Sequence, residues 1–124
     1  MTVKTHRLEN RSYIPLESKL LFNQFQFEQM MPNMIEEELL YRKSLGVTSD
    51  IVLKEMYYVS AAGSEKAEKN RLVLRPEGTA GVLRSVLNDN LLMKRIQKVP
   101  VKTWYWGPMF RHERPQTGRL RQFY

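Results

Sequence analysis

Two short strand-forming stretches near the end of the chain constrain its fold most. Residues 103–110 are rich in aromatic side chains, which favour strands. Residues 112–118 are polar and end in a glycine, as a turn does, and residues 120–124 begin a second strand. Two strands joined by a short polar turn predict an antiparallel hairpin.

A second pair of strands has the same arrangement. Residues 56–60 and 71–74 predict two strands, and the polar residues between them predict an exposed loop. Helices are predicted between the strand pairs, over residues 16–27, 36–45 and 79–92. In the second helix acidic residues come first and basic residues late, and Gly46 follows as a typical C-terminal cap. The sequence therefore predicts an α+β domain with a mainly antiparallel sheet.

The composition excludes several classes of protein. The 124 residues suit one small domain, and the absence of cysteine rules out disulfides, thiolate metal sites and cysteine nucleophiles. No apolar run reaches about 18 residues, so we expect no membrane-spanning helix and no membrane partner. The N-terminus lacks the apolar region of a secretory signal. We expect a cytoplasmic location, with an organellar one left open.

The positive charge is concentrated in the second half of the chain. The formal net charge is +7, with 9 basic and 10 acidic side chains in residues 1–70 but 11 basic and 3 acidic in residues 71–124. Such asymmetry favours a polyanionic partner, either nucleic acid or nucleotide phosphate. A solvated basic surface would explain the charge equally well.

The predicted hairpin carries the sharpest chemical feature. Alternation along a strand places Arg111 and Glu113 on one face. A guanidinium suits carboxylate or phosphate, and Phe123 on the returning strand offers a flat face on which a base could stack. The alternative is a surface ion pair worth about 0–1 kcal/mol.

A second feature lies where a strand meets the predicted third helix. Pro76 stiffens this corner, and Gly78 allows close approach of backbone. Thr79 is a candidate helix cap, which would leave Glu77 pointing toward a ligand. The alternative is helix capping alone.

Together these two segments resemble a known family. Arg-Pro-Glu-Gly-Thr-Ala at residues 75–80 and Phe-Arg-His-Glu-Arg-Pro at residues 110–115 closely resemble the bacterial-type histidyl-tRNA synthetases. In that family the hairpin is the second signature motif of class II aminoacyl-tRNA synthetases. The resemblance covers residues 27–124, after an N-terminal segment, residues 1–26, with a short helix. It implies a partial class II catalytic domain, truncated at Tyr124 before the third class II motif.

The resemblance assigns ATP-binding roles to the hairpin. Arg111 is similar to the class-defining catalytic arginine, which holds the ATP α-phosphate and the amino-acid carboxylate. Glu113 would accept the adenine amino group, and Phe123 would stack on adenine. Arg119 and Arg121 are candidates for further ATP contacts.

Histidine and tRNA are the other implied ligands. Glu77, Gly78 and Thr79 would bind the α-amino group of histidine, while Arg114 and Gln116 at the hairpin tip would face the tRNA acceptor end. The implied reaction makes histidyl-adenylate from histidine and ATP, with Mg²⁺ beside the phosphates, and then charges tRNA-His. No metal-ligand set is predicted in the chain itself, and the family is homodimeric.

The sequence departs from the family at one position, and two other functions are compatible with it. The first class II motif would place a proline at Asn33, and Pro32 comes one position early. The leading interpretation is an N-terminal piece of a histidine–tRNA ligase that does not catalyse alone. A non-catalytic histidyl-synthetase-like regulatory or histidine- or tRNA-sensing protein is the runner-up. A basic nucleic-acid-binding module, using Arg114, Arg119 and Arg121, is the third.

Overall fold

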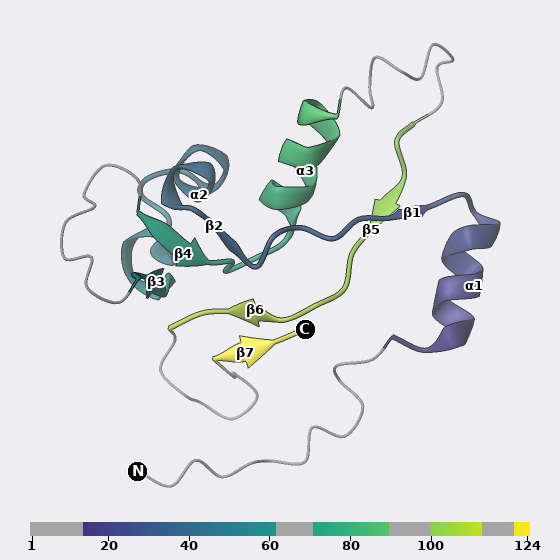
Figure 1. The fold of residues 1–124 in the computed structure, drawn as a ribbon, viewed down its shortest axis with the longest axis horizontal. Coiled ribbons are helices and arrows are strands. Elements are labelled where there is room, and N and C mark those ends of the chain that lie inside the picture. Colours follow the sequence, from purple (N-terminus) through teal and green to yellow (C-terminus); the bar gives the residue numbers. More distant parts are fainter. Residues whose placement is uncertain (1–13, 62–70, 90–99, 113–120) are drawn as a thin grey trace, which may run out of the picture.

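The computed structural model describes residues 14–61, 71–89, 100–112 and 121–124 (Figure 1). Its elements are helices α1 (Leu16–Gln24), α2 (Glu38–Leu45) and α3 (Thr79–Asn88), the π-helix η1 (Ile51–Glu55), and strands β1 (Glu28–Gln29), β2 (Ile35–Glu37), β3 (Tyr58–Val59), β4 (Leu72–Leu74), β5 (Thr103–Trp104), β6 (Met109–Phe110) and β7 (Gln122–Phe123). None of the helices in these residues is long and apolar enough to cross a membrane.

The core is built around an antiparallel sheet with strand order β2-β4-β3. Val73 is in the central strand, opposite Glu36 on one side and Tyr58 on the other, and it is fully buried. Tyr41, Val52, Met56 and Ala80 form the core with it. In Figure 1, α2 and α3 lie above this sheet and the β6–β7 pair lies below it. The fold that the sequence predicts, α+β with mainly antiparallel pairing, is confirmed; the parallel pair β1–β5 is the exception.

The predicted helices are present with shifted ends. The second helix starts at Glu38 because Glu36 and Glu37 pair with β4, and Gly46 follows it with φ +86°. The first helix ends at Gln24, shortly before Gln26 enters the left-handed region at φ +61°. No residue of α1 is buried, and Phe22 of this helix stacks on Trp104 with the ring centroids 5.0 Å apart.

The prediction of one strand over residues 103–110 is wrong. The structure divides this stretch into β5 and β6, with four residues between them. Gly107 lies there against the guanidinium of Arg75, which a Cβ at this position would meet, and the Pro108 carbonyl accepts a hydrogen bond from Arg75 Nε at 2.8 Å. The backbone therefore turns to the buried arginine instead of continuing a ladder.

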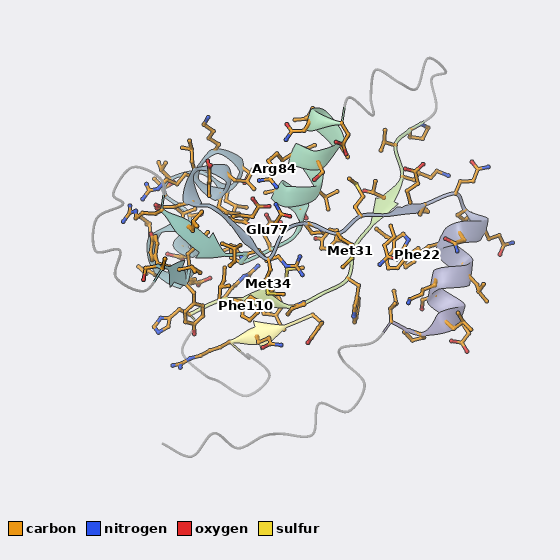
Figure 2. The ribbon with its side chains drawn as sticks, in the orientation of Figure 1. Phe22, Met31, Met34, Glu77, Arg84 and Phe110 are labelled. Carbon is orange, nitrogen blue, oxygen red and sulfur yellow. The ribbon has the colours of Figure 1, made fainter. Side chains whose placement is uncertain are left out.

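Arg75 joins three segments of the chain. It is 4% exposed and donates from Nη1 to the Pro32 carbonyl as well as from Nε to Pro108. Its backbone N–H donates to Met34 O at 2.9 Å, and its carbonyl accepts from Phe110 N at 3.0 Å. Figure 2 shows Met34 and Phe110 near this junction. Arg75 thereby fixes β6 beside the end of β4.

Arg75→Lys should lower the free energy of unfolding by about 2 kcal/mol, because an ammonium cannot reach both carbonyls as the planar guanidinium does. Urea unfolding followed by circular dichroism measures the change. Arg121→Lys is the matched control, since the Arg121 side chain is exposed, and it should stay within about 0.5 kcal/mol of the parent. Equal stability of the two variants would contradict the role given to Arg75.

Candidate functional site

The hairpin predicted at the end of the chain is present. Strand β6 pairs antiparallel with β7, with Met109 opposite Phe123 and Phe110 opposite Gln122. The Arg111 N–H donates to the Arg121 carbonyl at 3.0 Å, which extends the pairing by one residue. This pairing sets Arg111 and Phe123 on neighbouring strands.

Arg111 lies between the two segments that the sequence singled out. Its Nε donates to the Pro76 carbonyl at 3.0 Å, and its guanidinium carbon lies 5.0 Å from the centre of the Phe123 ring. A cation over an aromatic face is attracted by the ring quadrupole. The structure therefore brings the hairpin arginine to the corner formed by residues 75–80.

Glu77 caps helix α3. One carboxylate oxygen accepts from Thr79 N at 2.6 Å, and the other accepts from Ala80 N at 2.9 Å. A carboxylate is favourable here because the first helical N–H groups are unpaired and the helix dipole is positive at this end. The prediction that Thr79 caps the helix is wrong, since Glu77 binds the free N–H groups. Figure 2 shows Glu77 at the base of α3.

Tyr105 is a site residue that the sequence did not identify. Its hydroxyl lies 2.9 Å from the Thr79 hydroxyl, and its ring packs on Gly78, where a Cβ would come within 2.8 Å of Tyr105 Cδ2. The close approach predicted at Gly78 is therefore present. Nothing in the sequence indicated that Tyr105, which comes 26 positions after Thr79, would pack against this corner.

Only part of the predicted site lies in the described residues. Arg111, Arg121, Phe123, Glu77, Gly78 and Thr79 have positions, with Arg121 and Thr79 exposed. The others, Glu113, Arg114, Gln116 and Arg119, lie outside the described residues and stay predictions. Within the described parts of the chain, no group of three His, Cys, Asp or Glu residues could hold a metal ion.

His112 contacts the end of η1 and the residue that precedes β3. Its N–H donates to the Glu55 carbonyl at 2.7 Å, and its ring meets Tyr57 edge-on with the centroids 5.3 Å apart. These contacts tie the hairpin to η1 and to the residue before β3.

An ion pair with a buried carboxylate joins β2 to α3, the helix that begins at this corner. Glu36, 3% exposed in β2, accepts from both terminal nitrogens of Arg84 on α3, with Nη2 to Oε1 at 2.7 Å. Such a bidentate pair fixes orientation as well as distance. Figure 2 shows Arg84 directed from α3 toward the sheet. Pro32 packs on the same helix, because a Cβ on Gly81 would come within 2.9 Å of it.

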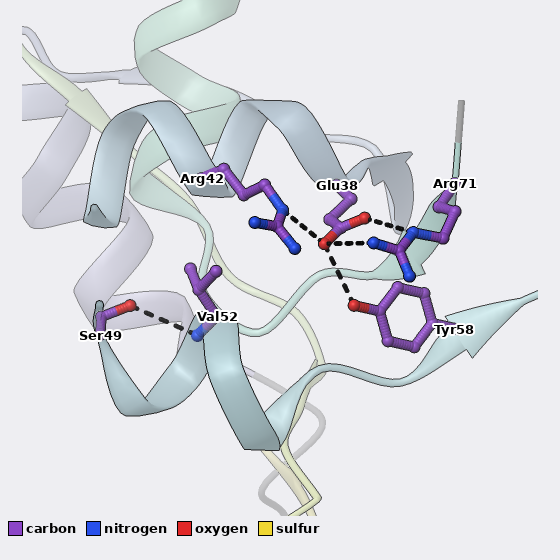
Figure 3. Close-up of polar contacts among 6 residues, drawn as sticks. All are labelled: Glu38, Arg42, Ser49, Val52, Tyr58 and Arg71. Carbon is purple, nitrogen blue, oxygen red and sulfur yellow. Dashed lines mark hydrogen bonds and ion pairs between the residues drawn. The ribbon is translucent and has the colours of Figure 1, made fainter. Parts of the chain in front are cut away.

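A second buried carboxylate stabilises the far end of the sheet (Figure 3). Glu38 accepts from Arg42 Nε at 2.6 Å and from the Tyr58 hydroxyl at 3.1 Å, and it pairs with Arg71 Nε at 2.8 Å. Burial alone would raise the pKa of Glu38, but these hydrogen bonds and the charge of Arg71 hold that pKa below its ordinary value of 4.5.

Comparisons with known proteins agree on one family. The family described as "tRNA synthetase class II core domain (G, H, P, S and T)" matches residues 57–124. A histidine–tRNA ligase of Ligilactobacillus salivarius is 44% identical over 112 residues, which are 90% of this chain and 25% of that protein. One from Mycoplasma capricolum is 45% identical over 120 residues, 94% of this chain and 27% of that one. The chain thus spans about a quarter of the length of these curated relatives.

Solved structures show the same fold. Apo histidyl-tRNA synthetase of S. aureus has a TM-score of 0.54 and 26% identity, over 77% of this chain and 23% of that one. Pyrrolysyl-tRNA synthetase of Desulfitobacterium hafniense has a TM-score of 0.60 over 86% of this chain and 34% of that one. At 16% identity the second likeness concerns the fold alone.

The lowered pKa of Glu38 predicts a pH dependence of stability. Because the carboxylate is favoured in the folded state, its stabilisation is complete above the unfolded pKa of about 4.5 and is lost as the pH falls through the lower folded pKa. Glu38→Gln should therefore lose most stability at neutral pH, and its deficit should shrink below about pH 4. Urea unfolding at both pH values, with Glu28→Gln as an exposed control, measures this. A deficit independent of pH would contradict it.

Proposed function

The chain belongs to the class II tRNA synthetase core domain family (G, H, P, S and T), and on this premise we propose that it carries part of the active site of a histidine–tRNA ligase. The observation that carries the proposal is the hydrogen bond from Arg111 Nε to the Pro76 carbonyl. It joins the hairpin arginine to the Arg-Pro-Glu-Gly-Thr-Ala segment, so that groups suited to phosphate, carboxylate and ammonium share one corner.

Arg111 would act on the reacting atoms. With its Nε held by Pro76, its two terminal nitrogens would meet the carboxylate of histidine and the α-phosphate of ATP. As the carboxylate attacks phosphorus and pyrophosphate leaves, negative charge builds on the phosphoryl oxygens, and a fixed guanidinium stabilises it. Holding both reactants at one arginine also reduces the entropic cost of bringing them together.

The amino group of histidine would bind beside the start of α3. Glu77 supplies a negative charge, and the exposed Thr79 supplies a hydroxyl. Gly78 leaves the backbone at this corner without a side chain of its own. An ammonium group, which only donates hydrogen bonds, would meet acceptors from both neighbours.

ATP and tRNA would extend the site along the hairpin. Phe123, whose ring lies 5.0 Å from the Arg111 guanidinium carbon, would stack on adenine, and Glu113 would accept from the adenine amino group. Arg119 and Arg121 would contact the nucleotide, while Arg114 and Gln116 would contact the acceptor end of tRNA-His. Mg²⁺ would enter with the ATP phosphates as part of the substrate. The homodimer implied by the resemblance stays a prediction.

Arg111→Ala should weaken recognition of the adenylate, because it removes the guanidinium that would meet the phosphate and the carboxylate. We expect the chain to bind histidyl-sulfamoyl-adenosine, a stable analogue of histidyl-adenylate, and the variant to bind it about 100-fold more weakly. Isothermal titration calorimetry measures both, and circular dichroism checks that the variant folds. Lys43→Ala removes the same charge from an exposed position on α2 and should bind as the parent does.

The histidine part of the proposal has its own control. The alanyl counterpart of the analogue keeps the adenosine, the sulfamate and the amino group but lacks the imidazole. A chain that binds the alanyl compound as tightly as the histidyl compound has no histidine site. Equal binding by the parent and by Arg111→Ala would remove the role assigned to the arginine.

A further inference from the structure

We propose that Tyr105 is a positioning residue of the amino-acid subsite, where it orients the Thr79 hydroxyl toward the ammonium group of the substrate. The inference rests on the proposed function and deepens it. The carrying observation is the 2.9 Å contact between the Tyr105 and Thr79 hydroxyl oxygens at the start of α3.

Tyr105 is well placed to hold a neighbour in one orientation. It follows β5 directly, and its ring lies against Gly78, where a Cβ would come within 2.8–2.9 Å of the ring atoms Cδ2 and Cζ. The ring position is therefore set by packing on backbone, and the hydroxyl is fixed with it. Thr79, by contrast, is exposed, so its side chain depends on Tyr105 to select one rotamer.

The chemistry of the ligand decides which hydroxyl donates in the contact between Thr79 and Tyr105. An ammonium group has three N–H donors and no acceptor, so Thr79 Oγ1 must present a lone pair to it. That is possible when the hydrogen of the Thr79 hydroxyl points elsewhere, and Tyr105 Oη is the acceptor within reach. By accepting this hydrogen, Tyr105 leaves Thr79 as an acceptor toward the ligand.

Glu77 completes the arrangement. Both of its carboxylate oxygens already accept from the helix, one from Thr79 N and one from Ala80 N. A carboxylate has about four lone-pair sites, so capacity for a third donor remains. The ammonium would thus meet a charge fixed by the helix and a hydroxyl fixed by Tyr105. The subsite should distinguish an α-amino acid from the same acid without its amino group.

The test uses Tyr105→Phe, which keeps the ring on Gly78 and removes the hydroxyl. Binding of histidyl-sulfamoyl-adenosine should weaken about tenfold, while binding of its counterpart without the α-amino group should change less than about twofold. In a Thr79→Val background the same change should have no further effect, because Tyr105 acts through Thr79. Tyr58→Phe is the matched control: it loses a hydroxyl bonded to Glu38, and it should leave the ratio of the two affinities unchanged.

Two results would overturn the inference and leave the proposed function standing. One is an equal loss for both ligands, which would indicate a purely structural hydroxyl. The other is an additive loss in the Thr79→Val background, which would show that Tyr105 acts independently of Thr79. A parent chain that binds the histidyl compound no more tightly than the alanyl one would overturn the proposed function itself, and that outcome is seen before any variant is made.

Discussion

The buried guanidinium of Arg75 is the interaction on which the rest of the site depends. Its side chain donates hydrogen bonds to the carbonyls of Pro32 and Pro108, which belong to two other segments. Its backbone bonds to Met34 and to Phe110. Burial lowers the pKa of Arg75, while Tyr41, Tyr105 and Glu36 oppose that shift. An arginine stays protonated in such surroundings, where a lysine would lose its proton more readily. The charge therefore remains available to both carbonyls over the ordinary pH range.

One consequence is that the corner after Arg75 is organised before any ligand arrives. Glu77 is held by two N–H groups of α3, and the Pro76 carbonyl holds Arg111 Nε. Glu77 and Arg111, the two charged groups that would meet a substrate, are thus both held by backbone atoms of residues 76–80. A site assembled in this way stabilises developing charge without rearranging at the moment of reaction. The same contacts that stabilise the fold position the proposed chemistry.

Local patterns in the sequence predicted the local structure well. The hairpins, the three helices and the cap at Gly46 follow from spacing, charge order and turn residues that lie close together in the chain. What the sequence did not indicate depends on distant partners, such as the pairing of Glu36 with Arg84, 48 residues later. The strand predicted over residues 103–110 failed for the same reason. Its aromatic composition favours a continuous strand, and Gly107 interrupts it only because Arg75 comes from elsewhere in the fold.

That interrupted segment shows how one stretch of chain can connect separate parts of the molecule. Successive side chains of an extended backbone point to opposite faces, and residues 104, 105 and 106 each contact a different segment of the chain. Trp104 stacks on Phe22 of α1, Tyr105 reaches Gly78 and Thr79, and Trp106 stacks on Tyr124 at 6.2 Å. Among the described residues the buried indole N–H groups of Trp104 and Trp106 have no acceptor, which costs about 1–3 kcal/mol each. The ring stacking of Trp104 and Trp106 offsets part of that cost. Because both chain neighbours of Tyr105 are packed, its backbone is anchored on each side, which helps to keep its hydroxyl beside Thr79.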